Sequence, residues 1–184
     1  MQLALFPLPV CLLPGGTTQL RIFEPRYKRL VSESLSTAQG FALCMLGEDN
    51  QPLPVATRAE IVDFETLEDG LLGITVHGKE RLEVLSWQSE SDGLKRGTVR
   101  TLPPWPQQQL TEDYRVLSDK LTELFQAYPR QNAFFEQADF NNLTWVCQRW
   151  LEILPIGLEH KQRCYREDNA ELTLTLLEQI FEKD

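Results

Sequence analysis

The sequence predicts an α+β fold, with a small β-barrel in residues 1–102 and a helical bundle in residues 109–184. Short runs of alternating polar and apolar residues fill the first part, and glycine or proline turns separate them. Three prolines in the stretch Pro103-Pro104-Trp105-Pro106 then stop both helix formation and sheet pairing. Beyond them, apolar residues recur every three or four positions, which indicates helices. We therefore expect two parts that join at a proline-rich boundary over residues 103–108.

The stretch Leu13–Tyr27 contains a turn, a strand and the start of a helix. Pro14-Gly15-Gly16 predicts the turn, because proline fixes φ and glycine permits positive φ. Polar and apolar residues alternate over Gln19–Phe23, which is the pattern of a half-buried strand. Pro25 can occupy the first helical position without loss of a hydrogen bond. This corner therefore predicts a helix over about residues 25–36, inserted within the β part.

Further segments of the β part also have strand patterns. The continuous apolar run Phe41–Leu46 predicts a strand buried on both faces. The mixed pattern of Val55–Leu67 predicts a strand that contains a bulge. Asp69-Gly70 predicts a tight hairpin turn, and Gly78 predicts a second turn. The remaining expected strands are Leu3–Phe6, Leu72–Val76, a strand that starts at Leu82, and Arg96–Leu102.

Capping residues place the helices of the second part. Thr111 can cap a first helix, and Asn142 can cap a second one. A further helix is expected over residues 158–165. Asp168 and Glu171 have the spacing of a capping box, which predicts a last helix that starts near them.

Composition and charge narrow the class of protein. The chain of 184 residues has 42% hydrophobic and 24% charged residues, which is ordinary for a globular protein with a packed core. Its net charge of −9 argues against nucleic acid, whose phosphates bind lysine and arginine. We therefore expect no nucleic-acid partner.

The N-terminus and the cysteines indicate a cytoplasmic protein with no membrane partner. The apolar stretch Leu3–Pro14 has no basic residues before it, contains prolines, and lacks the small-residue site of a secretion signal. It is also shorter than the roughly 20 apolar residues that span a bilayer. Four scattered cysteines are typical of reduced, buried thiols in such a chain; they are Cys11, Cys44, Cys147 and Cys164.

No catalytic, cofactor or metal motif is complete. Gly73–Lys79 matches the start of a phosphate-binding loop, but Glu80 stands where a serine or threonine is needed, and the stretch has a strand pattern. The two histidines, His77 and His160, belong to no zinc-binding pattern. Neither histidine lies beside a cysteine or a serine in the arrangement that activates a nucleophile. We therefore expect no catalytic residue, no cofactor, no metal and no enzymatic activity.

Three ordered motifs resemble one family. The first combines Phe6-Pro7-Leu8 and Leu13-Pro14-Gly15 with the stretch Ile22–Tyr27; the second is the segment Ala59–Leu82, and the third joins Leu154-Pro155-Ile156 to Lys161-Gln162. Together these motifs are similar to the N-terminal, substrate-binding domain of Lon proteases. The resemblance spans nearly the whole chain and implies a barrel similar to the PUA-like pseudobarrel, followed by helices. It includes neither the ATPase module nor the serine–lysine protease domain of complete Lon proteases, which implies a stand-alone domain.

The resemblance implies a non-catalytic module that binds unfolded or exposed segments of other proteins, with a separate ATPase or protease as an open question. An extended segment could bind by adding a strand to a free sheet edge. Two alternatives remain open at this stage. One is an RNA-binding module, since PUA-like barrels suggest it, and the other is a small-molecule or hydrolase site between the barrel and the helices.

The candidate peptide-binding residues are the polar and aromatic residues of the matched motifs, together with the tryptophan of the boundary: Phe23, Glu24, Arg26, Tyr27, Arg81 and Trp105. A structural role is the alternative for each of them. Glu24 could accept backbone amides at the helix start, and Arg81 could pair with Glu24 or Asp69. Trp105 could pack between the two parts. Phe134-Phe135, together with Phe140, form a second aromatic candidate.

Overall fold

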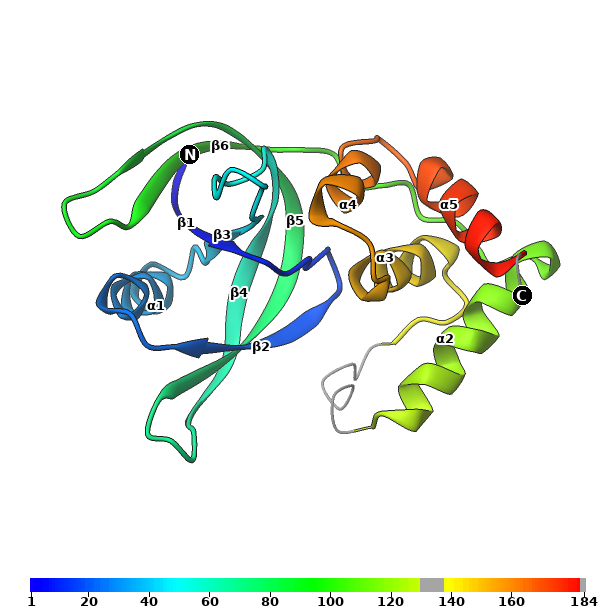
Figure 1. Cartoon of the computed structure of the whole chain (residues 1–184), viewed down its shortest axis with the longest axis horizontal. Coiled ribbons are helices and arrows are strands. Elements are labelled where there is room, and N and C mark those ends of the chain that lie inside the picture. Colours follow the sequence, from blue (N-terminus) through cyan, green and yellow to red (C-terminus); the bar gives the residue numbers. More distant parts are fainter. Residues whose placement is uncertain (130–137, 183–184) are drawn as a thin grey trace. The chain divides into compact units, whose positions relative to one another are not determined.

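In a computed structural model, the chain is described over residues 1–129 and 138–182. Its internal packing divides it into two compact units, Met1–Pro103 and Pro104–Asp184, each of which is described by itself. The first unit holds six β-strands and one helix, and the second holds the remaining helices (Figure 1).

The strands of the first unit form one sheet whose pairing closes into a ring. The sheet order is β2-β5-β4-β3-β1-β6, and β6 also pairs with β5. Strands β5, β4, β3, β1 and β6 therefore form the ring, while β2 lies outside it on β5. The pair β1–β3 is parallel and the other pairs are antiparallel. The strands are β1 (Gln2–Leu8), β2 (Thr17–Ile22), β3 (Phe41–Met45), β4 (Val55–Thr66), β5 (Leu72–Ser89) and β6 (Lys95–Thr101).

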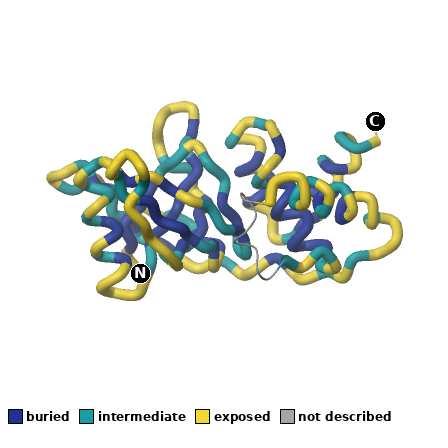
Figure 2. The backbone as a smooth tube through the Cα atoms, turned by 90° about the horizontal axis from the view of Figure 1, so that it is seen from below, coloured by how far each residue is buried: buried dark blue, intermediate teal, exposed yellow. Residues whose placement is uncertain are grey.

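This architecture confirms the predicted α+β fold class, with closed β-structure before the helices. All residues of β3 are buried, as the continuous apolar run predicts. The predicted irregularity in β4 is also confirmed, because its register with β5 shifts between Thr57 and Ala59 and again between Ile61 and Asp63. Burial is confined to part of the sheet, since the ends of β4 and β5 that lead into the hairpins are exposed, and Figure 2 shows buried and exposed stretches along the chain.

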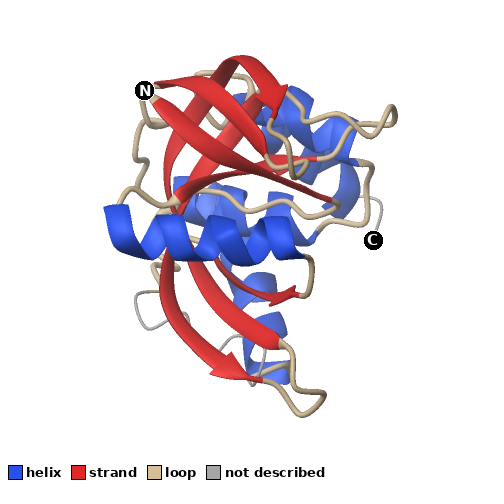
Figure 3. Cartoon of the chain, turned by 90° about the vertical axis from the view of Figure 1, so that its left-hand side faces the viewer, coloured by secondary structure: helices blue, strands red, loops and turns tan. Residues whose placement is uncertain are grey.

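Helix α1 (Pro25–Thr37) connects β2 to β3 and covers one side of the sheet (Figures 1 and 3). Leu30 and Val31 are buried on its inner face, but Leu35, which shares their helical spacing, is 49% exposed. The ring of Tyr27 stacks on that of Phe6 with 4.0 Å between centroids and 12° between planes. Aromatic packing at the first helical turn therefore fixes the corner between β2 and α1.

Gly78 does not form the turn that the sequence predicts, because β5 continues through it as an 18-residue strand. The Pro14–Gly16 turn crosses the strand at this point. The Gly15 amide donates to the carbonyl oxygen of Gly78 at 2.9 Å, and the Gly78 amide donates to that of Gly16 at 2.9 Å. An ideal Cβ at Gly78 would lie 2.3 Å from the carbonyl oxygen of Leu13. Glycine is needed here because two backbone segments approach closely, and not because the chain turns.

Over residues 104–129 and 138–182, the second unit contains a short 3-10 segment and four α-helices. The Asn142 side chain accepts a hydrogen bond from the Trp145 amide at 3.1 Å, which confirms the predicted cap. The capping box of Asp168 and Glu171 is wrong, because the helix begins at Glu171 and the Asn169 side chain accepts from that amide at 3.0 Å. The elements are η1 (Glu112–Tyr114), α2 (Arg115–Ala127), α3 (Leu143–Ile153), α4 (Leu158–Tyr165) and α5 (Glu171–Phe181).

Candidate functional site

Four of the six predicted binding residues lie together at the corner between β2 and α1. Phe23 is 63% exposed and offers an apolar side chain to solvent. The Arg26 guanidinium lies 4.8 Å from the centroid of the Tyr27 ring and donates to the Gly93 carbonyl oxygen at 3.1 Å. Its Nη2 also pairs with Glu24 Oε2 at 3.3 Å. Arg26 thus joins the corner to the hairpin that contains Gly93.

The predicted capping role of the Glu24 side chain is wrong. Glu24 is the N-cap residue of α1, but its side chain makes no capping hydrogen bond. Its carbonyl oxygen accepts from the amides of Tyr27 and Lys28 at 3.0 and 3.1 Å, while its carboxylate pairs with Arg26.

Of the other two predicted residues, Arg81 lies on β5 in the first unit and Trp105 lies in the second unit. Arg81, on β5, is 2% exposed, and its Nη1 donates to the Pro103 carbonyl oxygen at 2.9 Å. Asp69 pairs with Arg21 and Glu24 pairs with Arg26, and pairing of either carboxylate with Arg81 stays a prediction. Peptide contact by these residues stays a prediction.

Trp105 belongs to the second unit and is 1% exposed. Its Nε1 donates to the Glu167 carbonyl oxygen at 2.7 Å, and its ring meets that of Tyr165 edge to face. Of the second aromatic candidate, Phe134-Phe135 lie outside the described residues. Phe140 packs edge to face against Phe125 and Trp145 within the second unit.

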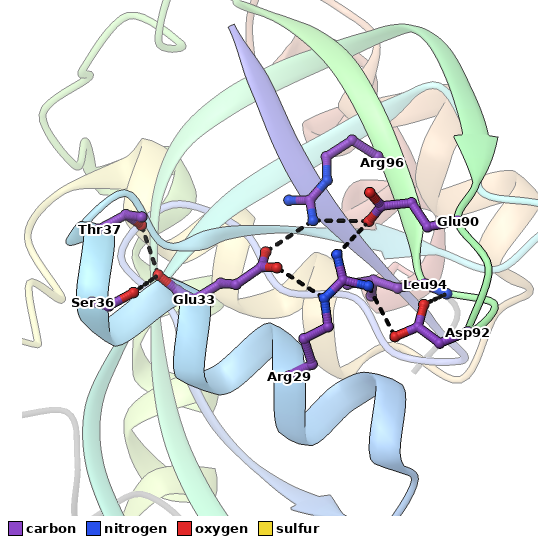
Figure 4. Close-up of polar contacts among 8 residues, drawn as sticks. All are labelled: Arg29, Glu33, Ser36, Thr37, Glu90, Asp92, Leu94 and Arg96. Atoms are coloured by element: carbon purple, nitrogen blue, oxygen red, sulfur yellow. Dashed lines mark hydrogen bonds and ion pairs between the residues drawn. The ribbon is translucent and has the colours of Figure 1, made fainter.

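An ion-pair cluster ties α1 to the β5–β6 hairpin (Figure 4). Arg29 of α1 contacts Glu33 at 3.0 Å, Glu90 at 2.8 Å and Asp92 at 2.9 Å. Arg96 of β6 contacts Glu33 and Glu90, both at 2.9 Å. Each guanidinium therefore bridges carboxylates from the helix and from the hairpin, and shared partners lower the entropic cost of each pair. We call these five residues the hairpin clamp.

The hairpin clamp lowers the pKa values of Glu90 and Asp92. A hydrogen bond from Arg96 lowers the pKa of Glu90, and Arg29 acts in the same direction. The amide of Leu94 and the guanidinium of Arg29 lower the pKa of Asp92. Because the folded pKa values lie below the unfolded ones, this stabilisation is present above the usual carboxyl pKa, and it is lost as the pH falls through the folded pKa.

We expect the variant Glu90→Gln to have a lower melting temperature than the native chain at pH 7, because it removes a carboxylate shared by Arg29 and Arg96. The difference should begin to shrink as the pH falls below the ordinary Glu value of 4.5, and it should vanish below the lower folded pKa, where Glu90 of the native chain is protonated as well. Thermal unfolding from pH 7 to pH 3 measures both quantities. Glu123→Gln on the exposed side of α2 is the matched control and should melt like the native chain. A difference that is constant over this pH range would contradict the role of the clamp.

A groove that the sequence did not predict lies on the face formed by β2, β4 and β5. Its volume is about 560 Å³. Leu67 forms one wall of the groove. An ideal Cβ at Gly73 would lie only 2.8 Å from Leu67 Cδ2, so Leu67 can take this position because residue 73 is a glycine. The lining residues are Gln19, Leu20, Arg21, Glu65, Leu67, Glu68, Asp69, Gly73 and Ile74.

The groove is acidic. Asp69 forms an ion pair with Arg21 across the β2–β5 face. Within residues 1–129 and 138–182, Glu65 and Glu68 form no ion pair, and both are exposed. Three carboxylates thus face one guanidinium, which leaves two negative charges at the groove. Glu65 and Glu68 lie on either side of Leu67 in the sequence. Only the pairing register of the strands shows that they line the groove beside β2.

Strand β2 also provides a sheet edge beside the groove. All six of its residues pair with β5, from Thr17 opposite His77 to Ile22 opposite Leu72. In the described part of the chain, no strand pairs with the outer edge of β2. Backbone N–H and C=O groups on such an edge can pair with an added strand.

The chemistry needed for metal binding or nucleotide binding does not come together. Among the described residues, no three histidine, cysteine or acidic side chains gather as metal ligands. Gly73–Lys79, the stretch that resembles part of a phosphate-binding loop, lies inside β5. His77 contacts the Thr17 hydroxyl through Nδ1 at 3.0 Å, which gives it a partner within the sheet.

The sequence profile of the ATP-dependent protease La (LON) substrate-binding domain matches residues 2–182. The chain belongs to this family. A crystal structure of a Lon N-terminal domain protein from Xanthomonas campestris shares 28% identity with it, covers 96% of each chain and superposes with a TM-score of 0.78. The resemblance inferred from the three sequence motifs is thereby confirmed.

Two other relatives show how far the LON likeness extends. The N-terminal domain of the Mycobacterium avium complex Lon protease covers 97% of each chain with a TM-score of 0.68, and at 11% identity it shows a shared fold alone. Protein cereblon from Gallus gallus is 31% identical over 98 residues, which is 51% of this chain and 22% of cereblon. The chain thus corresponds to only a small part of that protein. Within the described ranges, none of the LON domain helices is long and apolar enough to cross a membrane.

Proposed function

We propose that this LON domain is a non-catalytic module that binds unfolded or exposed segments of other proteins. The observation that carries the proposal is its membership of the LON substrate-binding family over residues 2–182. Three features of the first unit suit an extended segment: the groove, the outer edge of β2, and the exposed side chain of Phe23. Main-chain pairing along an edge gives affinity without sequence specificity, and neighbouring pockets then select side chains.

Nucleic acid is a poor partner on grounds of charge. The net charge is −9, and phosphate binding requires lysine or arginine side chains that can release their counterions. Many arginines of the first unit already contact carboxylates, which compete with phosphates for them. These are Arg21, Arg26, Arg29, Arg58, Arg96 and Arg100.

A module that only binds requires another protein to act on what it holds. The family description names an ATP-dependent protease, so a separate ATPase or protease is the class of partner that we propose. We place this activity in the cytoplasm, because the buried cysteine thiols suit a reducing compartment. Burial raises the pKa of Cys44 and of Cys147, each to about 12, which keeps both thiols protonated and unreactive.

The test compares unfolded and native forms of one reporter protein. The LON domain is immobilised, and a reduced, carboxymethylated reporter that stays unfolded is applied, followed by the native reporter. Biolayer interferometry should show retention of the unfolded form with a dissociation constant of about 1–100 μM, because ordering the bound segment costs free energy. The native form should not be retained. A β-sheet protein of similar size and net charge is the control surface.

Two results would overturn the proposed function. One is equal retention of the unfolded reporter on the LON domain and on the control surface. The other is cleavage or chemical conversion of the reporter by the purified LON domain alone, which gel electrophoresis and mass spectrometry of the flow-through would detect. Either result would replace a binding module with another class of protein.

A further inference from the structure

We propose that the groove beside β2 selects extended segments that carry lysine or arginine, and that the segment pairs with the outer edge of β2. This inference rests on the proposed function and adds to it a site and a chemical preference. The groove, the free edge and the acidic side chains come from separate parts of the chain, and the fold places all three within one surface of the first unit.

The edge provides the main-chain contacts. Strand β2 uses one side for β5 over its full length of six residues, and Gln19 and Arg21 are exposed. A segment added to the other side would extend the sheet by one strand, with alternate side chains on the groove face. Gln19 and Arg21 line the groove, so the side chains of the added strand on that face would lie next to it.

The groove offers space for those side chains. A volume of about 560 Å³ falls within the range of sites that enclose small ligands. The space depends on Gly73 and Leu67, because any side chain at position 73 would displace Leu67 Cδ2, which lies 2.8 Å from the ideal Cβ position. Leu67 also gives an apolar wall against which the methylene stem of a lysine or arginine can pack.

Charge decides which side chains enter. Asp69 is already paired with Arg21, whereas Glu65 and Glu68 have no ion-pair partner among the described residues of the chain. A cationic side chain in the groove would meet two carboxylates that can accept its hydrogen bonds. A glutamate in the same place would meet like charges, so the groove should discriminate against acidic segments. The preferred occupant is therefore an extended peptide in which basic residues alternate with apolar ones.

The experiment uses three fluorescent eight-residue peptides with valine and leucine at alternate positions. The other positions are all lysine, all glutamine or all glutamate. Fluorescence anisotropy with the intact LON domain at low salt should give a dissociation constant for the lysine peptide about tenfold below that for the glutamate peptide, with glutamine between them. A lysine peptide N-methylated at alternate amides should bind at least about fivefold more weakly, because it cannot complete strand pairing.

Matched variants locate the site. Glu65→Gln/Glu68→Gln should reduce the lysine preference to about twofold, whereas Glu123→Gln/Glu182→Gln, at exposed positions of the second unit, changes the net charge equally and should keep it. Gly73→Ala keeps every charge but displaces Leu67 into the groove, and it should weaken binding of all three peptides. Circular dichroism establishes that each variant is folded.

The outcomes separate this inference from the proposed function. Equal affinities for the three peptides, or a lysine preference that survives Glu65→Gln/Glu68→Gln, would overturn the acidic groove as the site. Equal affinity for the N-methylated peptide would overturn pairing with β2. If the unfolded reporter is still retained in either case, the proposed function stands and the binding surface lies elsewhere. If the unsubstituted LON domain does not retain the unfolded reporter, both the proposed function and this inference are overturned.

Discussion

Gly78→Ala is expected to lower the free energy of unfolding by about 3 kcal/mol, because a new Cβ would overlap backbone that cannot move. The ideal Cβ lies 2.3 Å from the Leu13 carbonyl oxygen and 3.0 Å from its carbonyl carbon. Two backbone hydrogen bonds, from Gly15 and to Gly16, hold the crossing segments together at this point. Relief of the overlap would therefore break at least one of these hydrogen bonds. Urea denaturation followed by far-ultraviolet circular dichroism measures the change.

Gly73→Ala is the matched control for this variant. It makes the same chemical change in the same strand, but the atom that it meets is the end of the Leu67 side chain, 2.8 Å away. A flexible side chain can rotate aside, so we expect a loss below about 1 kcal/mol. Equal stability losses for the two variants would show that β5 resists a side chain at either position, and that the backbone crossing at Gly78 is not the cause.

Phe41→Ala is expected to lower the free energy of unfolding by about 4 kcal/mol, because it removes a fully buried ring from the core of the first unit. Phe41 is 0% exposed, in a strand whose residues are all buried. Its ring lies 6.0 Å from that of Phe6, which in turn stacks on Tyr27 of α1. The cavity would thus lie between the sheet and the aromatic contacts that hold the helix. The same urea denaturation experiment applies.

Phe23→Ala provides the comparison, since it deletes the same atoms from a side chain that is 63% exposed. The loss of stability should be below about 1 kcal/mol, because little apolar surface returns to water. If Phe23→Ala is as destabilising as Phe41→Ala, the corner residue is part of the core, and its role as an exposed apolar contact for a peptide is wrong.

Local sequence patterns correctly predicted the features that depend only on neighbouring residues. The Asn142 cap, the turn at Gly70, and the proline at the start of α1 depend on residues within one turn of chain, and all three are present. The mixed pattern of Val55–Leu67 also predicted a bulge, because its apolar residues do not keep to one face of a regular strand, and β4 contains two register shifts.

The turn predicted at Gly78 was wrong because a distant segment decides the conformation there. Glycine is typical of turns, but at Gly78 it is explained by the crossing of β5 with Leu13–Gly16, which lies 62 to 65 residues away in the sequence.

The predicted capping box was wrong for a local reason. Asp168 and Glu171 have capping-box spacing, but the helix starts at Glu171. Spacing identifies a helix start only to within a few residues.

The candidate site was predictable only in part. The motif Ile22–Tyr27 led to the exposed corner, whereas Arg81 is buried within the first unit and Trp105 is buried and belongs to the second unit. The acidic groove went unpredicted because Glu65 and Gly73 face β2 only through the pairing register of three strands. The one available signal was the pair of glutamates on either side of Leu67, before the Asp69-Gly70 turn.

Strand β5 is shared by three neighbours: it pairs with β2 over Leu72–His77, with β4 over Leu72–Glu83 and with β6 over Leu82–Ser89. No hairpin can detach from the first unit without exposing the amides of this strand. Hydrogen exchange in the middle of β5 should consequently proceed only through global opening, whereas the edge amides of β2 exchange by local fluctuation. The outer edge of β2 can therefore fluctuate on its own while the rest of the sheet opens as a single cooperative block.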